Sequence, residues 1–274
     1  MVIVAHWVDK EFKLQKRIIN FCQVIDHKGE SIGKEIEVCL KDWGIGKLFG
    51  ITVDNASSND KVVQYLKMKF QEKKGGLILE GKYLHMRCCA HIVNLIVNEG
   101  LKERHHSIQS IRNAVRYVRS SPARLNKFKE CVNEEEISCQ GLFCLDVPTR
   151  WNSTYLMLDT AIKFAKAFDK MTEYANYLKY FEEKEKDGTK RDGPPCDLDW
   201  ENAKVFVRFL QTFYDVTMKF SGSTYVTSNK YFTEISGIQD ELLLLASGID
   251  SSPSHKEGLL EDMARGMKKK YDKY

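Results

Sequence analysis

The chain has 274 residues, 43% hydrophobic and 29% charged, so it can bury a full core and is not a disordered protein. Its 42 basic and 38 acidic residues leave a net charge of only +4, so any binding of nucleic acid must depend on local clusters. Eight scattered cysteines without a signal peptide predict reduced thiols in a cytosolic or nuclear protein. No apolar run reaches the roughly eighteen residues of a membrane span.

The first residues predict a β-hairpin. Residues 2–8 read as a strand, residues 9–11 as a turn, and the alternation over residues 14–25 as the partner strand. A chain that starts inside a strand is typical of a fragment. Residues 31–43 then predict a helix, with Gly44 just past its end.

The next unit is a strand, an acidic turn and a helix. Residues 47–53 form a short apolar run that stops at Asp54, and Ser57 or Ser58 can cap a helix. That helix repeats an apolar residue every fourth position, at Val62, Leu66 and Phe70. Asp54 therefore lies at the carboxyl end of a buried strand, where open α/β sheets bind ligands. Either it holds a divalent metal through hard oxygen ligands, or it serves only the turn and the helix cap.

A second strand-to-helix junction follows. Residues 86–89 predict a short strand that runs directly into a helix ending near Gly100. Cys88 and His91 have the spacing of half a zinc site, but no second ligand pair stands nearby, so a structural zinc site is not expected. The alternatives are a buried cysteine with a helix-start histidine, or a histidine that contacts a phosphate beside Asp54.

The following helix has an apolar face and a basic face. The apolar face carries Ile108, Ile111, Val115 and Val118, and the basic face carries Arg112, Arg116 and Arg119 and continues into Arg124, Lys127 and Lys129. Arginines spaced by one helical turn can lie along a phosphate backbone, whereas many charged helix faces serve only solubility. The sequence leaves both interpretations open.

Arg150 and Trp151 precede a helix that Asn152 or Ser153 is predicted to cap. Trp151 is either a staple packed on the first turn or, together with Arg150, a phosphate fork beside a base-stacking plate. The helix is predicted to continue to residue 180, with a core face that includes Leu156. Further helices are expected over residues 199–220, 231–245 and 258–271, and the first of them carries an aromatic stripe typical of a core.

Several separate motifs occur in order over roughly the first 170 residues. They are Ala5-His6-Trp7, Lys16-Arg17-Ile18-Ile19, Thr52-Val53-Asp54-Asn55-Ala56-Ser57, Cys88-x-x-His91 with Asn94-Leu95, and Thr149-Arg150-Trp151-Asn152-Ser153-Thr154. With these motifs the chain resembles the hAT family of DNA transposases, most closely its plant BED-finger, RICESLEEPER-like branch.

The resemblance implies an RNase H-like fold in which Asp54 looks like the second carboxylate of the DDE triad. It also implies that Cys88 and His91 line the site and that Trp151 supports a flipped base at the DNA hairpin step. The first Asp of the family lies on a strand before the hairpin and the Glu lies beyond a long helical insertion, and neither is found here. A two-metal phosphoryl transfer needs several fixed carboxylates, so Asp54 alone should not assemble the site.

We therefore expect an α/β fold, with an RNase H-like mixed sheet lacking its first strand in residues 1–150. A truncated, all-helical insertion region is expected in residues 151–274. The expected function is that of a transposase-derived, DNA-binding protein of a plant nucleus, truncated or domesticated and without catalysis. The expected DNA contacts are Cys88, His91, Arg112, Arg116, Arg119, Lys127, Arg150 and Trp151. No cofactor should bind firmly, and Mg²⁺ or Mn²⁺ should bind at Asp54 only if an active site were completed.

Two alternatives stay open. An active DNA transposase or nuclease would need a replacement carboxylate near Asp54, for which Asp26, Asp146 and Glu261 are the candidates. An interaction module would pair with full-length relatives as a hetero-oligomer and would touch no DNA. No membrane partner is expected in either case.

Overall fold

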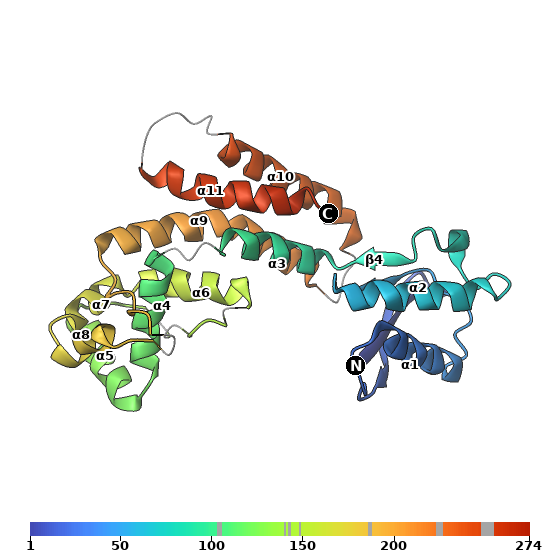
Figure 1. Ribbon diagram of the computed structural model, residues 1–274, viewed down its shortest axis with the longest axis horizontal. Helices are drawn as coiled ribbons and strands as arrows, with labels where there is room; N and C mark the ends of the chain where they lie inside the picture. The colour runs from blue at the N-terminus through green and yellow to red at the C-terminus, as the bar shows by residue number, and fades with distance from the viewer. Residues whose placement is uncertain are drawn as a thin grey trace. The chain divides into compact units, whose positions relative to one another are not determined.

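The computed structural model describes residues 1–102, 106–139, 141, 144–147, 149–185, 188–222, 227–247 and 255–274 (Figure 1). The chain forms two compact units. Unit 1 comprises residues 1–92 with 222–229, and unit 2 comprises residues 93–221 with 230–274. The boundary predicted after residue 150 therefore lies inside unit 2. Helices that precede residue 150 contact helices that follow it, which makes the strand-bearing unit shorter than predicted.

Unit 1 begins with the predicted hairpin. Strand β1 (Val2–Val8) pairs antiparallel with β2 (Leu14–Phe21), and the register shifts between Ile3 and Val4. The turn is held by Asp9, whose Oδ1 accepts hydrogen bonds from the backbone N–H groups of Glu11 and Lys13, both at 2.9 Å. A short polar side chain that bonds its own backbone favours such a turn.

The second pairing of unit 1 is parallel. Strand β3 (Ile51–Val53) pairs with β4 (His85–Arg87), and Thr52 lies opposite Met86. Antiparallel and parallel pairing are thus both present, as expected for a mixed sheet. The described strands form two separate two-stranded ladders, β1–β2 and β3–β4.

Helices α1 (Gly29–Asp42) and α2 (Ser57–Gln71) pack on each other and supply the core of unit 1. This core consists of Leu40, Val62, Leu66 and Phe70. Ile19 of β2 and Ile51 of β3 both pack against it, so the two ladders contribute to the same core. The fourfold apolar repeat predicted for α2 is confirmed. A short 3₁₀ helix, η1 (Ile78–Gly81), precedes β4.

Two glycines let α1 and α2 approach closely. A Cβ added to Gly29 would lie 2.3 Å from the backbone oxygen of Ser58, and one added to Gly33 would lie 2.7 Å from Cδ1 of Tyr65. The Tyr65 hydroxyl then donates a 2.7 Å hydrogen bond to Glu37, and this bond raises the pKa of Tyr65 to about 12. The close approach at Gly29 therefore brings the first turn of α1 against the first turn of α2.

The other face of the β1–β2 hairpin is open to solvent. Cross-strand partners share a face, and three of the pairs on this face are apolar, namely Val2 with Phe21, Val4 with Ile18, and Val8 with Leu14, whereas His6 with Lys16 is a polar pair among them. Ile18 is 66% exposed and Phe21 is 83% exposed. We call these six side chains the open hairpin face. Hydrophobic side chains gathered in this way are unusual on a soluble protein surface.

Unit 2 is helical, as predicted. Among its described residues, the β pairing is limited to an isolated bridge between Lys184 and Lys190. Its helices are α3 (Cys89–Gly100, whose first residues belong to unit 1), α4 (His106–Arg119), α5 (Pro122–Glu134), α6 (Trp151–Ile162), α7 (Ala165–Met171), α8 (Ala175–Glu182), α9 (Asp197–Phe220), α10 (Tyr231–Ala246) and α11 (His255–Tyr271), with a 3₁₀ turn η2 (Ser228–Lys230) before α10. Across the part of the chain that the structure describes, no helix combines the length and apolar character that a membrane crossing requires.

Helix α9 is the central element of unit 2. It contacts α4 and α6 as well as α10 and α11, and Figure 1 shows it running between these two groups. Its inner stripe is buried, as predicted, and consists of Trp200, Ala203, Phe206, Leu210 and Phe213. Helix α4 contributes the four apolar residues expected from its sequence. The core of unit 2 is therefore built largely from aromatic and aliphatic side chains of these helices.

The continuous helix predicted from Trp151 to Tyr180 is wrong, because α6, α7 and α8 divide this segment. Phe164 lies between α6 and α7 with φ −109° and is 1% exposed. No proline or glycine interrupts the segment, so tertiary packing, which brings α7 against α5, overrides a uniform helical propensity. Leu156 was expected in the core, but it is 46% exposed.

Candidate functional site at the carboxyl edge of β3 and β4

Strands β3 and β4 run parallel and end at the same edge. Asp54 follows β3 and Cys88 follows β4, and the backbone N–H of Cys88 donates a 3.1 Å hydrogen bond to the carbonyl of Val53. His91 lies in the first turn of α3, directly after this edge. The junctions that the sequence singled out therefore lie next to each other.

The Asp54 carboxylate organises the turn into α2. Its Oδ1 accepts hydrogen bonds from the backbone N–H of Ala56 at 2.9 Å and from Nδ2 of Asn59 at 2.6 Å. This is the turn chemistry that the sequence offered as part of one alternative, and the N-cap residue of α2, Ala56, makes no side-chain cap. Within the described ranges, no three His, Cys, Asp or Glu side chains gather as ligands for a metal ion. Asp54 alone would give Mg²⁺ one carboxylate, and water and substrate phosphates would have to complete its octahedral oxygen coordination.

Buried polar atoms without partners occur at Asn55, directly after Asp54, and at His85, which starts β4 opposite Ile51. In the described part of the chain, neither amide atom of Asn55 has a hydrogen-bond partner, and Nε2 of His85 has none either. Nδ1 of His85 lies 3.7 Å from the Asp60 carboxylate. A buried polar group left without a hydrogen bond costs about 1–3 kcal/mol, so each of these atoms needs a partner such as a water or a ligand. Sequence reasoning missed Asn55 and His85, although Asn55 stood inside the quoted motif.

One cysteine at this edge, Cys89, is poorly suited to a metal. Burial, with a smaller contribution from the neighbouring Cys88, raises the pKa of Cys89 to about 12. Because the thiolate is the form that binds metals, Cys89 stays a weak ligand near neutral pH.

Three cations of the predicted basic stripe form ion pairs with acidic side chains. Arg112 forms a forked ion pair with Asp146, with Nε to Oδ1 at 3.0 Å and Nη2 to Oδ2 at 2.8 Å. The Asp146 side chain is 1% exposed and also accepts a 2.7 Å hydrogen bond from Thr154. Arg112 thus holds the segment that carries Asp146 between α4 and α6.

Two further members of the stripe are also paired. Arg116 donates to Glu185 at 3.2 Å, and Lys127 donates to Glu130 at 2.7 Å, a bond that raises the pKa of Lys127. Arg119 is exposed and has no described partner. The four side chains therefore do not present one continuous cationic surface.

The side chains of Arg150 and Trp151 lie in different environments, one exposed and one buried. Trp151 is the first residue of α6 and is 1% exposed, with its ring 6.5 Å from that of Tyr155. This position is that of a core staple. The helix begins earlier than the predicted caps, because the Ser153 hydroxyl bonds Val147 and donates to the Arg150 carbonyl. Arg150 itself is exposed and free to reach a phosphate.

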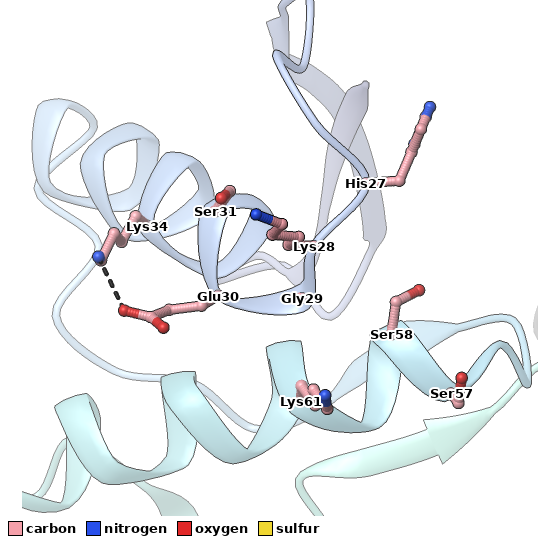
Figure 2. A pocket seen from close by; sticks show the side chains of 9 residues that line it. All are labelled: His27, Lys28, Gly29, Glu30, Ser31, Lys34, Ser57, Ser58 and Lys61. Carbon is pink, nitrogen blue, oxygen red and sulfur yellow. Dashed lines mark ion pairs between the residues drawn. The ribbon is translucent and has the colours of Figure 1, made fainter.

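A hollow in unit 1 escaped the sequence reasoning. It lies between the first turns of α1 and α2 and has a volume of about 510 Å³ (Figure 2). Its lining residues are His27, Lys28, Gly29, Glu30, Ser31, Lys34, Ser57, Ser58 and Lys61. The two contributing segments lie far apart in the chain. The signal that could have found it is a lysine and a glycine before one helix and two serines at the start of the other.

Two families match this chain. The ZBED1 RNase-like domain matches residues 1–83, and the ZBED1 RNase-like helical domain matches residues 86–192. Together they cover more than half of the chain, and their border lies close to the division between units 1 and 2. The RNase H-like fold followed by a helical region, expected from the sequence, is confirmed.

The chain is also similar to curated proteins along its whole length. It is 31% identical to "Putative AC transposase" of Zea mays and 29% identical to zinc finger BED domain-containing protein RICESLEEPER 2 of Oryza sativa subsp. japonica, with 100% and 99% of the chain aligned. These alignments cover 32% and 35% of the two relatives, so the chain spans about a third of their length. A human relative, zinc finger BED domain-containing protein 4, is 28% identical over 78% of the chain and 17% of its own length.

Proposed function

The chain belongs to the hAT family of transposase-derived proteins, and on that premise we propose that residues 1–274 bind DNA without cleaving it. The observation that carries the proposal is the similarity to plant transposases along the entire chain. The RNase-like unit agrees with it, because its two parallel strands, β3 and β4, end at the edge where Asp54 lies. We expect a protein with this function in the nucleus, and the Zea mays and Oryza sativa relatives support a plant source.

The absence of cleavage is proposed from the chemistry at Asp54. Its Oδ1 is used by the turn into α2, and it is the member of the DDE triad that the sequence supplies. In-line phosphoryl transfer on two metal ions needs several fixed carboxylates. The replacement acids weighed from the sequence have other partners: Asp26 accepts from the Lys28 backbone at 3.0 Å, Asp146 is paired with Arg112, and Glu261 is paired with Arg265.

The DNA contacts follow from the positions of the cationic side chains. Arg119 and Arg150 are exposed and are the strongest of the predicted contacts. Arg112 and Arg116 would have to leave Asp146 and Glu185 before they could neutralise a phosphate. The binding expected from so few exposed arginines is weak, salt-sensitive and largely independent of sequence.

A second function is favoured by the open hairpin face. Six apolar side chains in register form a surface that a partner chain could cover, as an interaction module that pairs with full-length relatives would require. This module would touch no DNA, so DNA binding separates the two functions.

The test is a titration of residues 1–274 with a labelled DNA duplex at several salt concentrations. The DNA-binding function predicts a measurable affinity that falls linearly on logarithmic axes as salt increases. No binding at about 50 mM salt would instead leave the interaction module as the function. In parallel, a nicking assay with Mg²⁺ should show no cleavage, and Asp54→Asn should bind DNA as the unaltered protein does. Cleavage that Asp54→Asn abolishes would overturn the catalytic part of the proposal.

A further inference from the structure

The hollow between α1 and α2 has the donors of an anion site. Figure 2 shows lysines from both segments that line it. Lys28 is the residue before α1, Lys34 lies in α1, and Lys61 lies in α2. Lys34 forms a 2.8 Å ion pair with Glu30, which lowers the pKa of that carboxyl. Lys28 and Lys61 are exposed and have no ion pair among the described residues. The lining therefore carries an excess of positive charge.

Hydroxyl and backbone donors add to this charge. Both helices start at the hollow, and neither has a side-chain cap on its first backbone N–H groups. The free N–H groups and the helix dipole favour an anion, and the serines of α2, Ser57 and Ser58, add hydroxyl donors. Three further acids belong to these helix starts: Asp26, which is engaged by the Lys28 backbone and the Ser31 side chain, Asp54, whose carboxylate accepts from the Ala56 N–H, and Asp60 in the first turn of α2.

The convergence of these groups depends on close helix packing. Gly29 lines the hollow, and the absence of its Cβ lets the first turn of α1 lie directly on Ser58 and Lys61. Lys28, the residue before α1, and Lys61 of α2 thus line one hollow together with both helix starts. The space is larger than a phosphate and open to solvent, which suits a phosphate that belongs to a passing chain.

We propose that this hollow binds a phosphate group and that, when the protein is on DNA, the group is a backbone phosphate. The DNA-bound part of this inference rests on the proposed function. It moves the main phosphate contact from the predicted stripe on α4 and α5, whose cations are largely paired, to Lys28 and Lys61. The same donors would take a free phosphate, so the test must separate the two sources.

The first arm compares two double variants in the salt-titrated duplex assay. Lys28→Gln with Lys61→Gln removes the two unpaired cations of the hollow, whereas Lys10→Gln with Lys47→Gln removes two exposed cations elsewhere in unit 1. The hollow variant should bind DNA about threefold to tenfold more weakly at low salt, and its salt slope should fall by about one. The control should change both quantities much less. If the two variants behave alike, the hollow is not the phosphate contact, while the proposed function stands.

The second arm uses inorganic phosphate and needs no DNA. Amide signals of Gly29, Ser57 and Ser58 should shift on titration of the ¹⁵N-labelled protein, and the shifts should be lost in the hollow variant. If DNA does not bind but these shifts occur, the hollow binds free phosphate. The phosphate site then stands, and the proposed DNA-binding function is wrong. If the shifts do not occur and the hollow variant binds DNA normally, the phosphate site is overturned.

Discussion

Unit 2 surrounds its aromatic core with helices, whereas unit 1 covers only one face of its hairpin and leaves six apolar side chains in solvent. The difference follows from the elements themselves. A helix satisfies its own backbone hydrogen bonds and needs only one covered stripe, whereas a strand needs a partner strand, and a sheet face that is apolar also needs a covering layer. Unit 2 should therefore be the more stable part, and unit 1 the part that depends on other surfaces.

The largest expected effect comes from the two cores. Phe206 of α9 is fully buried in unit 2, and its replacement by Ala should cost about 4 kcal/mol through the lost contacts and the cavity. Leu66→Ala in unit 1 should cost about 3 kcal/mol. Hydrogen exchange read by mass spectrometry should show that each variant loosens its own unit. If each loosened both units to the same extent, the chain would unfold as one body and the comparison would fail.

A buried ion pair stabilises unit 2 at one point. Asp146→Ala should cost about 3 kcal/mol, because it leaves the Arg112 guanidinium without its partner in a half-buried site. Asp215 of α9 is exposed and bonds only Gln211 of its own helix among the described residues, so Asp215→Ala is the matched control with an effect within about 0.5 kcal/mol. Urea denaturation measures both. Equal midpoints for the two variants would show that the pair contributes nothing.

Replacing a glycine by alanine should lower the stability of unit 1 and raise that of unit 2. Gly29→Ala should destabilise unit 1 by about 2 kcal/mol, because the new Cβ meets a backbone oxygen that cannot move aside easily. Gly237→Ala in α10 meets no atom within 4 Å and should stabilise unit 2 by up to about 1 kcal/mol through helix propensity. Thermal denaturation of each variant gives the sign. A stabilising Gly29→Ala would show that the helices can separate without loss.

The smallest effect is a pH dependence in unit 2. Burial raises the pKa of Glu241 on α10, against a smaller opposing effect of a hydrogen bond with Thr212. A carboxyl whose folded pKa lies above its unfolded pKa contributes stability at low pH and loses it as pH rises through the folded value. Glu241→Gln should therefore flatten the fall in stability from about pH 4 upward. Parallel pH profiles for the two proteins would contradict the assignment.

Elements with a strong period were predictable from sequence, and contacts between distant side chains were not. The fourfold repeat of α2 and the aromatic stripe of α9 identified both helices and their buried faces. By contrast, the charged face of α4 looked exposed because the partner of Arg112, Asp146, lies 34 residues further along the chain. The same limit applies to the site: turn chemistry identified Asp54, but the hollow combines two segments that only the packing of Gly29 brings together.

The open hairpin face also has a consequence for handling the protein. Its strands offer β-branched and aromatic side chains beside a free backbone edge, a combination that favours intermolecular β pairing and precipitation. Lys16 and Arg17 lie at the middle of β2 and act as charged gatekeepers against such growth. Solubility should accordingly fall as salt screens these two charges, and low-salt buffers should keep concentrated samples clear.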